Sequence, residues 1–366
     1  MIVIPIFEVK EMKADVAIVG AGPAGMSAAL TAEKSGAEVI LLDESFSLGG
    51  QLRQDTKWYT SLPNKYDEQY GVTLNEQLIH QLNQTNVTSL TTHTLIGSYL
   101  NGHMAVTNGE RTIEIEAKKI ILAPGAQEEA KIFPGWTLPG VMTASAAQSL
   151  INRERILPGK KAIMLGLNDF SIEIAKQLEA CGVSIFAFVD DKDSNSIKFS
   201  HEEIEGLQHV PVYLNSTLES VTGRNGVEKV IISTPHQIEE VNADLVCISN
   251  GFSPILEPFE ILGCDFTYNQ ELGGFMPKYN SHLQTSNSLC YVAGNAAGIT
   301  SLGPTLLTGE IAAISVLEVL TFINAEEAKQ KREELWEEVS QIESCFNENI
   351  VNARLTLMEN TVEEIG

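Results

Sequence analysis

Three glycines near the start of the chain have the spacing of a phosphate-binding turn. Gly20, Gly22 and Gly25 follow an apolar run and open a helical pattern, and Pro23 and Ala24 complete the turn. In this G-x-G-x-x-G arrangement the first glycine permits a tight turn, the second lets the backbone approach a pyrophosphate, and the third lets the helix pack close to the strand. A helix N-terminus also offers unpaired N–H groups and partial positive charge. These five residues therefore predict a dinucleotide-binding site.

An acidic residue stands where such a site needs one. Asp43 follows the second apolar strand, and a carboxylate there can accept hydrogen bonds from ribose hydroxyl groups. Glu44 takes that place if the strand ends one residue later. The turn and the acid together predict dinucleotide binding, but they do not tell one dinucleotide from another.

The order of strand, glycine turn, helix, glycine, strand and acidic residue occurs twice in the chain. The first copy spans residues 14–43 and the second spans residues 160–190. Strands that are apolar throughout are typical of a parallel sheet that is covered on both faces. Two such βαβ units predict an α/β fold with two Rossmann-like dinucleotide-binding domains.

The second copy has lost most of its glycines. It keeps Gly166, but Asn168 and Ser171 stand where the second and third glycines are expected, and Asp169 adds negative charge near the phosphate position. Two interpretations stay open: this domain is a scaffold without a nicotinamide nucleotide, or it binds NAD or another adenine nucleotide in an altered pose. NADPH is disfavoured, because the acids at 190 and 191 would repel its extra phosphate.

Later motifs narrow the choice of cofactor. Gly49-Gly50-Gln51 comes soon after the first acid, and Ala123-Pro124-Gly125 closes an apolar strand. A further apolar strand ends at Gly294-Asn295. After it, Gly303-Pro304 predicts the start of a helix that runs from about Thr305 to Phe322.

In this order the motifs resemble those of the two-dinucleotide-domain flavoprotein reductases, the superfamily of thioredoxin reductase. The resemblance implies an FAD cofactor that Gly50 and Gln51 contact along the flavin. It also makes Ala123, Gly125 and Gly294 cofactor-binding positions. Asn295 stands where these proteins have an aspartate that bonds the ribityl chain, and an amide can still make such a bond. The helix that opens at Thr305 would direct its positive end at the flavin.

A second stretch carries a narrower resemblance. No cysteine precedes Cys181, so a redox dithiol ahead of the second turn is excluded. Residues 133–148 instead read FPGWTLPGVMTASAAQ. This stretch looks very like that of the α subunits of heteromeric amine and imino-acid dehydrogenases, which include sarcosine oxidase, opine oxidase, dye-linked proline or hydroxyproline dehydrogenase and hydrogen cyanide synthase. The resemblance covers about residues 14–323.

That resemblance implies a function for the chain within a larger assembly. It would be the FAD-binding α subunit of a multisubunit oxidoreductase for an amino or imino acid such as proline, hydroxyproline or sarcosine, with the substrate oxidised in a partner subunit. The implied partners include a second flavoprotein and a small iron–sulfur subunit, because many members end in a four-cysteine segment and this chain has only Cys345 there.

Two alternatives remain at this point. One is a stand-alone NAD(P)H-dependent flavoprotein reductase that passes electrons to a small protein acceptor. The other is a non-catalytic nucleotide-binding scaffold subunit. No Ser-His-Asp group or carboxylate pair accompanies the flavin motifs, so the sequence identifies no catalytic residue.

The motifs also suggest domain boundaries. We expect a discontinuous FAD-binding domain from residues 14–128 and 249–323, an NAD(P)-binding-like domain over residues 137–246, and a helical tail over residues 324–366. In the tail, apolar residues at spacings of three and four predict one or two amphipathic helices, which pack on the chain itself or dock a partner: Trp336, Val339, Ile342, Phe346 and Ile350.

Charge and composition exclude several kinds of partner. The chain of 366 residues carries 48 acidic against 24 basic residues, a formal net charge of −24. Such a surface repels nucleic acid and anionic membranes. The sequence shows no uncharged apolar run of membrane-spanning length. The five cysteines and seven histidines have no metal-ligand spacing. We therefore expect a cytoplasmic protein without a metal and without a membrane span.

Overall fold

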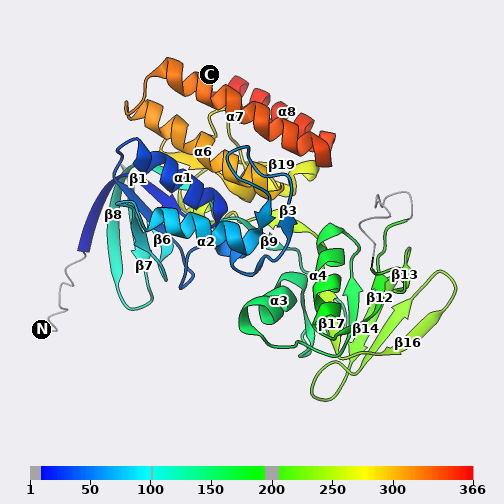
Figure 1. The fold of residues 1–366 in the computed structure, drawn as a ribbon. Helices are drawn as coiled ribbons and strands as arrows, with labels where there is room; N and C mark the ends of the chain where they lie inside the picture. The colour runs from blue at the N-terminus through cyan, green and yellow to red at the C-terminus, as the bar shows by residue number, and fades with distance from the viewer. Residues whose placement is uncertain (1–9, 100–101, 194–205, 366) are drawn as a thin grey trace, which may run out of the picture. The chain divides into compact units, whose positions relative to one another are not determined.

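The computed structural model describes residues 10–99, 102–193 and 206–365 of the chain (Figure 1). The chain divides into two compact units. The first unit combines Met1–Gln127 with Ser253–Gly366, and the second unit is Glu128–Phe252. The first unit is therefore built from both ends of the chain, and the second is inserted into it.

The first unit contains a seven-stranded sheet with the order β5-β2-β1-β8-β7-β6, in which β21 also pairs with β8. Residues 16–19 of β1 and all of β2 are buried, as expected for strands covered on both faces. The parallel part of the sheet consists of β1 (Lys10–Val19), β2 (Val39–Leu42), β5 (Thr88–Leu90), β8 (Thr112–Leu122) and β21 (Cys290–Val292).

Strand β8 is long enough to take two partners on the side away from β1. Its first residues pair antiparallel with β7 (His103–Thr107), which continues to β6 (Thr94–Ser98). Its last residues pair parallel with β21. The carboxyl ends of β1, β8 and β21 consequently lie next to one another at one edge of the sheet. In open α/β sheets this edge is where ligands bind.

Three helices of the first unit matter for that edge: α1 (Pro23–Lys34), α2 (Gly71–Leu82) and α6 (Leu302–Val319). Helix α6 is almost wholly buried, and most of its residues are apolar, as expected for a helix in a protein core. The smaller elements are η1 (Gly50–Gln54), β3 (Trp58–Tyr59), β4 (Gln69–Tyr70), α5 (Glu257–Ile261), β19 (Phe266–Asn269), η4 (Gln270–Leu272), β20 (Gly274–Pro277) and η5 (Gly294–Ala297).

The structure corrects the predicted bounds of α6, about Thr305 to Phe322. The helix begins at Leu302 because Ser301 has the extended backbone of an N-cap, and the first turn accommodates Pro304. It ends at Val319, and Thr321 already has a left-handed φ of 63°. Among the described residues, α6 is the one helix long and apolar enough to cross a membrane, but 83% of it is buried inside the protein. We interpret it as a core helix.

The second unit repeats the plan of the first. A parallel five-stranded sheet has the order β10-β17-β11-β12-β13, and a three-stranded antiparallel sheet has the order β14-β15-β16. The predicted α/β fold with two Rossmann-like halves is confirmed. The elements are β10 (Val141–Thr143), α3 (Ala144–Ser149), the π-helix η3 (Leu150–Glu154), β11 (Lys161–Leu165), α4 (Asp169–Ala180), β12 (Ser184–Val189), β13 (Val212–Tyr213), β14 (Thr217–Thr222), β15 (Lys229–Ser233), β16 (Ile238–Asn242) and β17 (Leu245–Ile248). Strands β9 (Ala126–Glu128) and β18 (Phe252–Pro254) lie where the chain passes between the units.

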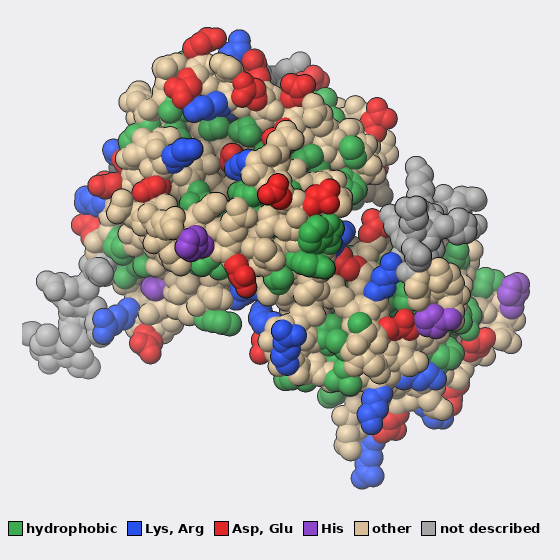
Figure 2. Space-filling model, in the orientation of Figure 1, with side chains coloured by type: hydrophobic (Ala, Val, Ile, Leu, Met, Phe, Trp, Pro, Cys, Tyr) green, Lys and Arg blue, Asp and Glu red, His purple; other side chains and the backbone are tan. Residues whose placement is uncertain are grey.

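The C-terminal segment forms a helical hairpin on the first unit. Its helices are α7 (Ala325–Phe346) and α8 (Glu348–Ile365). The predicted apolar stripe packs on the core through Trp336, Val339, Ile342 and Ile350, whereas Phe346 is exposed at the end of α7. Figure 2 shows acidic side chains, with fewer basic ones, over the outer surface of this hairpin. The hairpin therefore has an apolar inner face and a charged outer face.

Candidate functional site

Close backbone approach fixes the first glycine turn. Gly20 has a φ of 99°, and a Cβ there would overlap the carbonyl of Ala123. A Cβ at Gly25 would overlap the carbonyl oxygen of Gly20. Gly22 differs, because its φ is −73° and no atom of the described chain lies within 4 Å of a Cβ built there. Gly20 and Gly25 thus serve the fold, whereas Gly22 leaves open space at the N-terminus of α1.

Asp43 is the acidic residue that faces this turn. Its Oδ2 accepts a hydrogen bond from the backbone nitrogen of Ala21 at 2.6 Å, and its Oδ1 accepts one from that of Ser45 at 2.8 Å. Each carboxylate oxygen has a second lone pair with which it can accept a ribose hydroxyl. Glu44 is exposed. Of the two predicted acids, the structure brings Asp43 to the turn.

The Gly49-Gly50-Gln51 segment packs directly against the turn. The nitrogen of Gly49 donates to the carbonyl of Ala21 at 2.8 Å, and a Cβ at Gly50 would come 2.9 Å from the Cα of Gly22. Both glycines have positive φ, so the segment needs them. Gln51 is the second residue of η1 and has an exposed side chain, whose Oε1 accepts a hydrogen bond from Gln54.

Asp55 is an acidic side chain at the end of this segment. Burial raises the pKa of Asp55, and hydrogen bonds from the Tyr59 hydroxyl, at 2.6 Å, and from the nitrogen of Lys57 oppose that rise. Its carbonyl accepts from the nitrogen of Val72 at 2.8 Å. These contacts join η1 to the start of α2, so a structural role explains why the Asp55 carboxyl group is buried here.

The strand ends predicted to border the cofactor meet at the same edge. Ala123 is buried, and its nitrogen donates to Val19 at 2.8 Å. Gly125 has a φ of 85°. The nitrogen of Ala293 donates to the carbonyl of Leu122 at 2.9 Å, which sets the end of β21 beside the end of β8.

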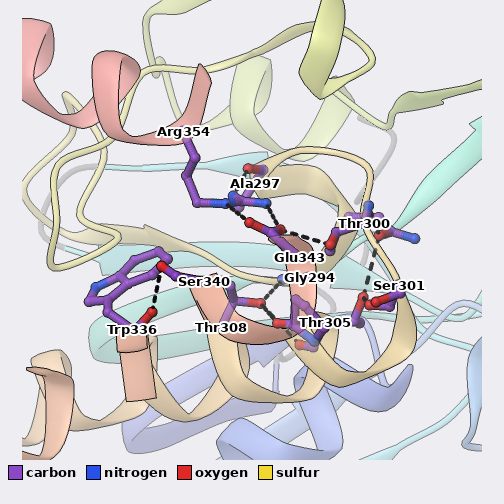
Figure 3. Close-up of polar contacts among 12 residues, drawn as sticks. Gly294, Ala297, Thr300, Ser301, Thr305, Thr308, Trp336, Ser340, Glu343 and Arg354 are labelled. Atoms are coloured by element: carbon purple, nitrogen blue, oxygen red, sulfur yellow. Dashed lines mark hydrogen bonds and ion pairs between the residues drawn. The ribbon is translucent and has the colours of Figure 1, made fainter. Parts of the chain in front are cut away.

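The loop between β21 and α6, residues 293–301, reaches the first glycine turn. A Cβ at Gly294 would lie 2.8 Å from the Cβ of Ala24, and its nitrogen donates to Thr308 Oγ1 at 3.0 Å (Figure 3). The Oδ1 atom of Asn295 accepts from the nitrogen of Thr300 at 3.2 Å and from the Thr305 hydroxyl at 3.4 Å. We refer to this segment as the β21–α6 loop.

Features of this edge fit the phosphates and flavin of an FAD molecule. Helices α1 and α6 both begin here without a side-chain cap, so their first N–H groups face the edge. The hydroxyl of Ser301 at the start of α6 is buried and makes no hydrogen bond within the described residues. The open space at Gly22 would let a pyrophosphate approach the backbone. The described chain therefore leaves donors at both helix starts that a bound dinucleotide can use.

The second turn has the same backbone but a closed phosphate position. A Cβ at Gly166 would overlap the carbonyl of Ser249, and Asp190 Oδ2 accepts from the nitrogen of Leu167 at 2.7 Å. Asn168, however, caps α4: its Oδ1 accepts from the nitrogen of Ser171 at 2.9 Å, and its Nδ2 donates to Ser249 at 2.8 Å. In the first unit the start of α1 would receive phosphate. At the equivalent start of α4, the side chain of Asn168 accepts the hydrogen bond from the backbone N–H group instead.

The described residues contain five free thiols and no metal-ligand cluster. All five cysteines are free, and Cys247, Cys264 and Cys290 are buried. No group of three or more His, Cys, Asp or Glu side chains in the described ranges is placed to hold a metal ion.

Sequence reasoning missed two contributors to this edge. Ser301 is the N-cap residue of α6 and lies ahead of the predicted Gly303-Pro304 start. Arg354 in α8 and Glu343 in α7 are buried charges that contact the β21–α6 loop. In the sequence, only the position of Arg354 between Ala353 and Leu355 could have signalled the second contribution.

Comparison with known proteins identifies the family. Residues 14–316 match the model of the pyridine nucleotide-disulphide oxidoreductase family. The chain belongs to this family and is an FAD-dependent oxidoreductase.

Among curated proteins, the chain is similar to an opine oxidase subunit of Rhizobium meliloti, with 29% identity over 83% of this chain. It is also similar to the alpha subunit of sarcosine oxidase from Rhizobium meliloti (strain 1021), with 28% identity over 84% of this chain. The chain spans 62% of the length of the first relative and 30% of the second. The resemblance seen in residues 133–148 is confirmed.

Solved structures share the fold. L-Proline dehydrogenase from P. horikoshii matches with a TM-score of 0.72 and 23% identity, covering 90% of this chain and 60% of that one. Thioredoxin reductase from T. acidophilum matches with a TM-score of 0.69 and 19% identity, covering 84% of this chain and 99% of that one.

Alanine at two of the glycines separates cofactor binding from folding. We expect Gly22→Ala to change the free energy of unfolding of the apoprotein by less than about 0.5 kcal/mol, since the added methyl meets no described atom. The same change should raise the dissociation constant for FAD about tenfold or more, because it fills the phosphate approach. Flavin titration of apoprotein and urea unfolding measure the two effects.

Gly25→Ala is the matched control. Its methyl group overlaps the Gly20 carbonyl, so the apoprotein should lose about 1–3 kcal/mol of stability. FAD binding by Gly22→Ala at wild-type strength would contradict the assignment of the turn.

The cap at the second turn gives a separate prediction. Asn168→Ala should lower the free energy of unfolding by about 0.5–2 kcal/mol, because the first turn of α4 loses its acceptor. Asn168→Asp keeps that acceptor and loses only the donation from Nδ2 to the carbonyl of Ser249, so it should lose less. Urea unfolding of the full chain checks the order, and a smaller loss in Asn168→Ala than in Asn168→Asp would contradict a stabilising cap.

Proposed function

We propose that this chain is the FAD-binding α subunit of a multisubunit dehydrogenase or oxidase that acts on an amino or imino acid such as proline, hydroxyproline or sarcosine. The observation that carries the proposal is the contrast between the two turns. The first is open at Gly22, and the second is closed by its own Asn168. A chain with one open dinucleotide turn can hold FAD but lacks a ready site for the nicotinamide nucleotide that a stand-alone reductase needs.

The relatives supply the substrate class. The opine oxidase and sarcosine oxidase relatives are both named as subunits, and both names specify oxidation of an amine-containing compound. We place substrate oxidation in a partner subunit, because both relatives are named as single subunits of their oxidases. The proposed partners are a second flavoprotein and a small iron–sulfur subunit. The buried free thiols suit a reducing compartment, and we propose the cytoplasm.

Each residue at the edge has a defined task in this proposal. Gly20 and Gly25 keep the backbone of the turn in place, and Gly22, Pro23 and Ala24 face the pyrophosphate at the start of α1. Asp43 holds the adenosine ribose. The remaining predicted positions orient the flavin end of the cofactor: Gly50, Gln51, Ala123, Gly125, Gly294, Asn295 and Thr305. When bound, FAD accepts and passes on electrons, while these side chains fix its place and exclude water.

Anaerobic reduction of the bound flavin tests the function. In the purified chain alone, neither proline, hydroxyproline nor sarcosine should bleach the flavin, and NADH should bleach it slowly at most, because Asn168 occupies the phosphate position. In the complex purified with its partners, one of the amino-acid substrates should reduce the flavin. Stopped-flow absorbance measures both cases.

Two outcomes would count against this function. Rapid bleaching of the isolated chain by NADH or NADPH would favour a stand-alone reductase. If none of the three substrates reduced the flavin of the complex, the proposed substrate class would be wrong.

A further inference from the structure

A buried ion pair joins the two helices of the C-terminal hairpin. Arg354 Nη2 of α8 lies 2.7 Å from Glu343 Oε1 of α7, and each side chain is at most 3% exposed. A second contact joins Arg354 Nε to Glu343 Oε2 at 3.2 Å, so the pair is bidentate. Burial by itself lowers the pKa of Arg354, but Tyr279 and Glu343 raise it above its ordinary value. The arginine is charged.

Both members of the pair also bond to the β21–α6 loop (Figure 3). Arg354 Nη1 donates to the carbonyl of Ala297 at 2.6 Å, and the hydroxyl of Tyr279 donates to the same carbonyl at 2.7 Å. Glu343 Oε1 accepts from the hydroxyl of Thr300 at 2.8 Å. The hairpin thus holds the loop at two points, one on each side of Gly298.

Those two points fix the part of the loop that faces the first glycine turn. Gly294 lies against Ala24, and the Oδ1 atom of Asn295 accepts from the nitrogen of Thr300. The Thr300 hydroxyl in turn is bonded to Glu343. A short chain of hydrogen bonds therefore connects α7 and α8 to the side chain of Asn295.

Stability alone does not explain why charges are buried here. Two apolar side chains of similar size usually hold a pair of helices together as well as a buried ion pair does. Only hydrogen-bonding groups can hold the carbonyl of Ala297 and the hydroxyl of Thr300 in one orientation. The chain also contains a second partly buried pair, Arg332 with Glu318, which joins α7 to α6 with an Nη1–Oε2 distance of 2.5 Å. The hydrogen bonds found for that pair do not reach the β21–α6 loop.

We propose that Arg354 and Glu343 are positioning residues of the FAD site: the C-terminal hairpin clamps the β21–α6 loop in the conformation that receives the cofactor. The inference rests on the proposed FAD site at the first glycine turn and extends it to α7 and α8. The hairpin is then a part of the cofactor site in this chain.

The test replaces the pair in the full-length protein and measures FAD affinity and stability separately. In the double variant Arg354→Met/Glu343→Leu, apolar side chains replace both charges, so the urea midpoint of the apoprotein should stay close to that of the wild type. Its dissociation constant for FAD, measured by flavin fluorescence during titration of apoprotein, should rise about tenfold or more. The visible spectrum of the remaining bound flavin should shift, because Asn295 is no longer fixed.

The control is Arg332→Met/Glu318→Leu, which removes the other ion pair of α7. It should change the dissociation constant for FAD less than about twofold, a negligible free-energy difference. Thr300→Val is a milder second variant that removes only the loop hydroxyl, and it leaves Glu343 bonded to Arg354. It should weaken FAD binding several-fold even if the double variant fails to fold.

The outcomes separate this proposal from the proposed function. Wild-type affinity for FAD in both the double variant and Thr300→Val would overturn the positioning role and leave the function intact. Equal weakening in the Arg332/Glu318 control would overturn it as well, since general loss of hairpin packing would then explain the effect. A wild-type apoprotein that binds no FAD would contradict the FAD site itself, on which both proposals rest.

Discussion

The contact between a strand end and a glycine turn is the constraint on which both halves of the molecule depend. At Gly20 the backbone turns with positive φ against the carbonyl of Ala123, and at Gly166 it turns in the same way against Ser249. A side chain at either position would push the turn away from the end of the neighbouring parallel strand. In each half, an aspartate carboxylate accepts a hydrogen bond from the backbone nitrogen of the residue that follows this glycine. Asp43 accepts from Ala21, and Asp190 accepts from Leu167. The fold therefore needs this turn in both halves, whether or not a ligand binds there.

The duplicated turn distinguishes residues that the fold needs from residues that a ligand needs. The first glycine and the aspartate are present in both copies and make matching contacts. The second position differs: Gly22 is open, whereas Asn168 fills the place with a helix cap and bonds to Ser171 and Ser249. A helix start that has lost its anion must satisfy its N–H groups in another way, and a side-chain cap does so. The second unit thus keeps the Rossmann fold while its own side chain caps the helix start.

The sequence predicts most of this architecture because its signals are local. Apolar strands, glycine turns and strand-end acids lie within about thirty residues of one another, so two Rossmann units can be recognised without tertiary information. The sequence misplaces the start of α6 because Gly303-Pro304 is a strong signal, yet the first turn of the helix contains it. The sequence identifies Asn168 and Ser171 as lost glycines, but it does not predict that their side chains cap α4. Sequence reasoning cannot assign Arg354, because its partners come from Tyr279, Ala297 and Glu343, which only tertiary packing brings together.

The central claim is that one of the two dinucleotide turns is competent and the other is closed. The most direct measurement is the nucleotide content of the full-length protein as purified, released by denaturation and quantified by chromatography against protein concentration. We expect one FAD per chain and no nicotinamide nucleotide in the protein as purified. We expect the same content after incubation with excess NAD followed by removal of unbound ligand. One equivalent of NAD retained beside FAD, or a chain without FAD, would contradict it.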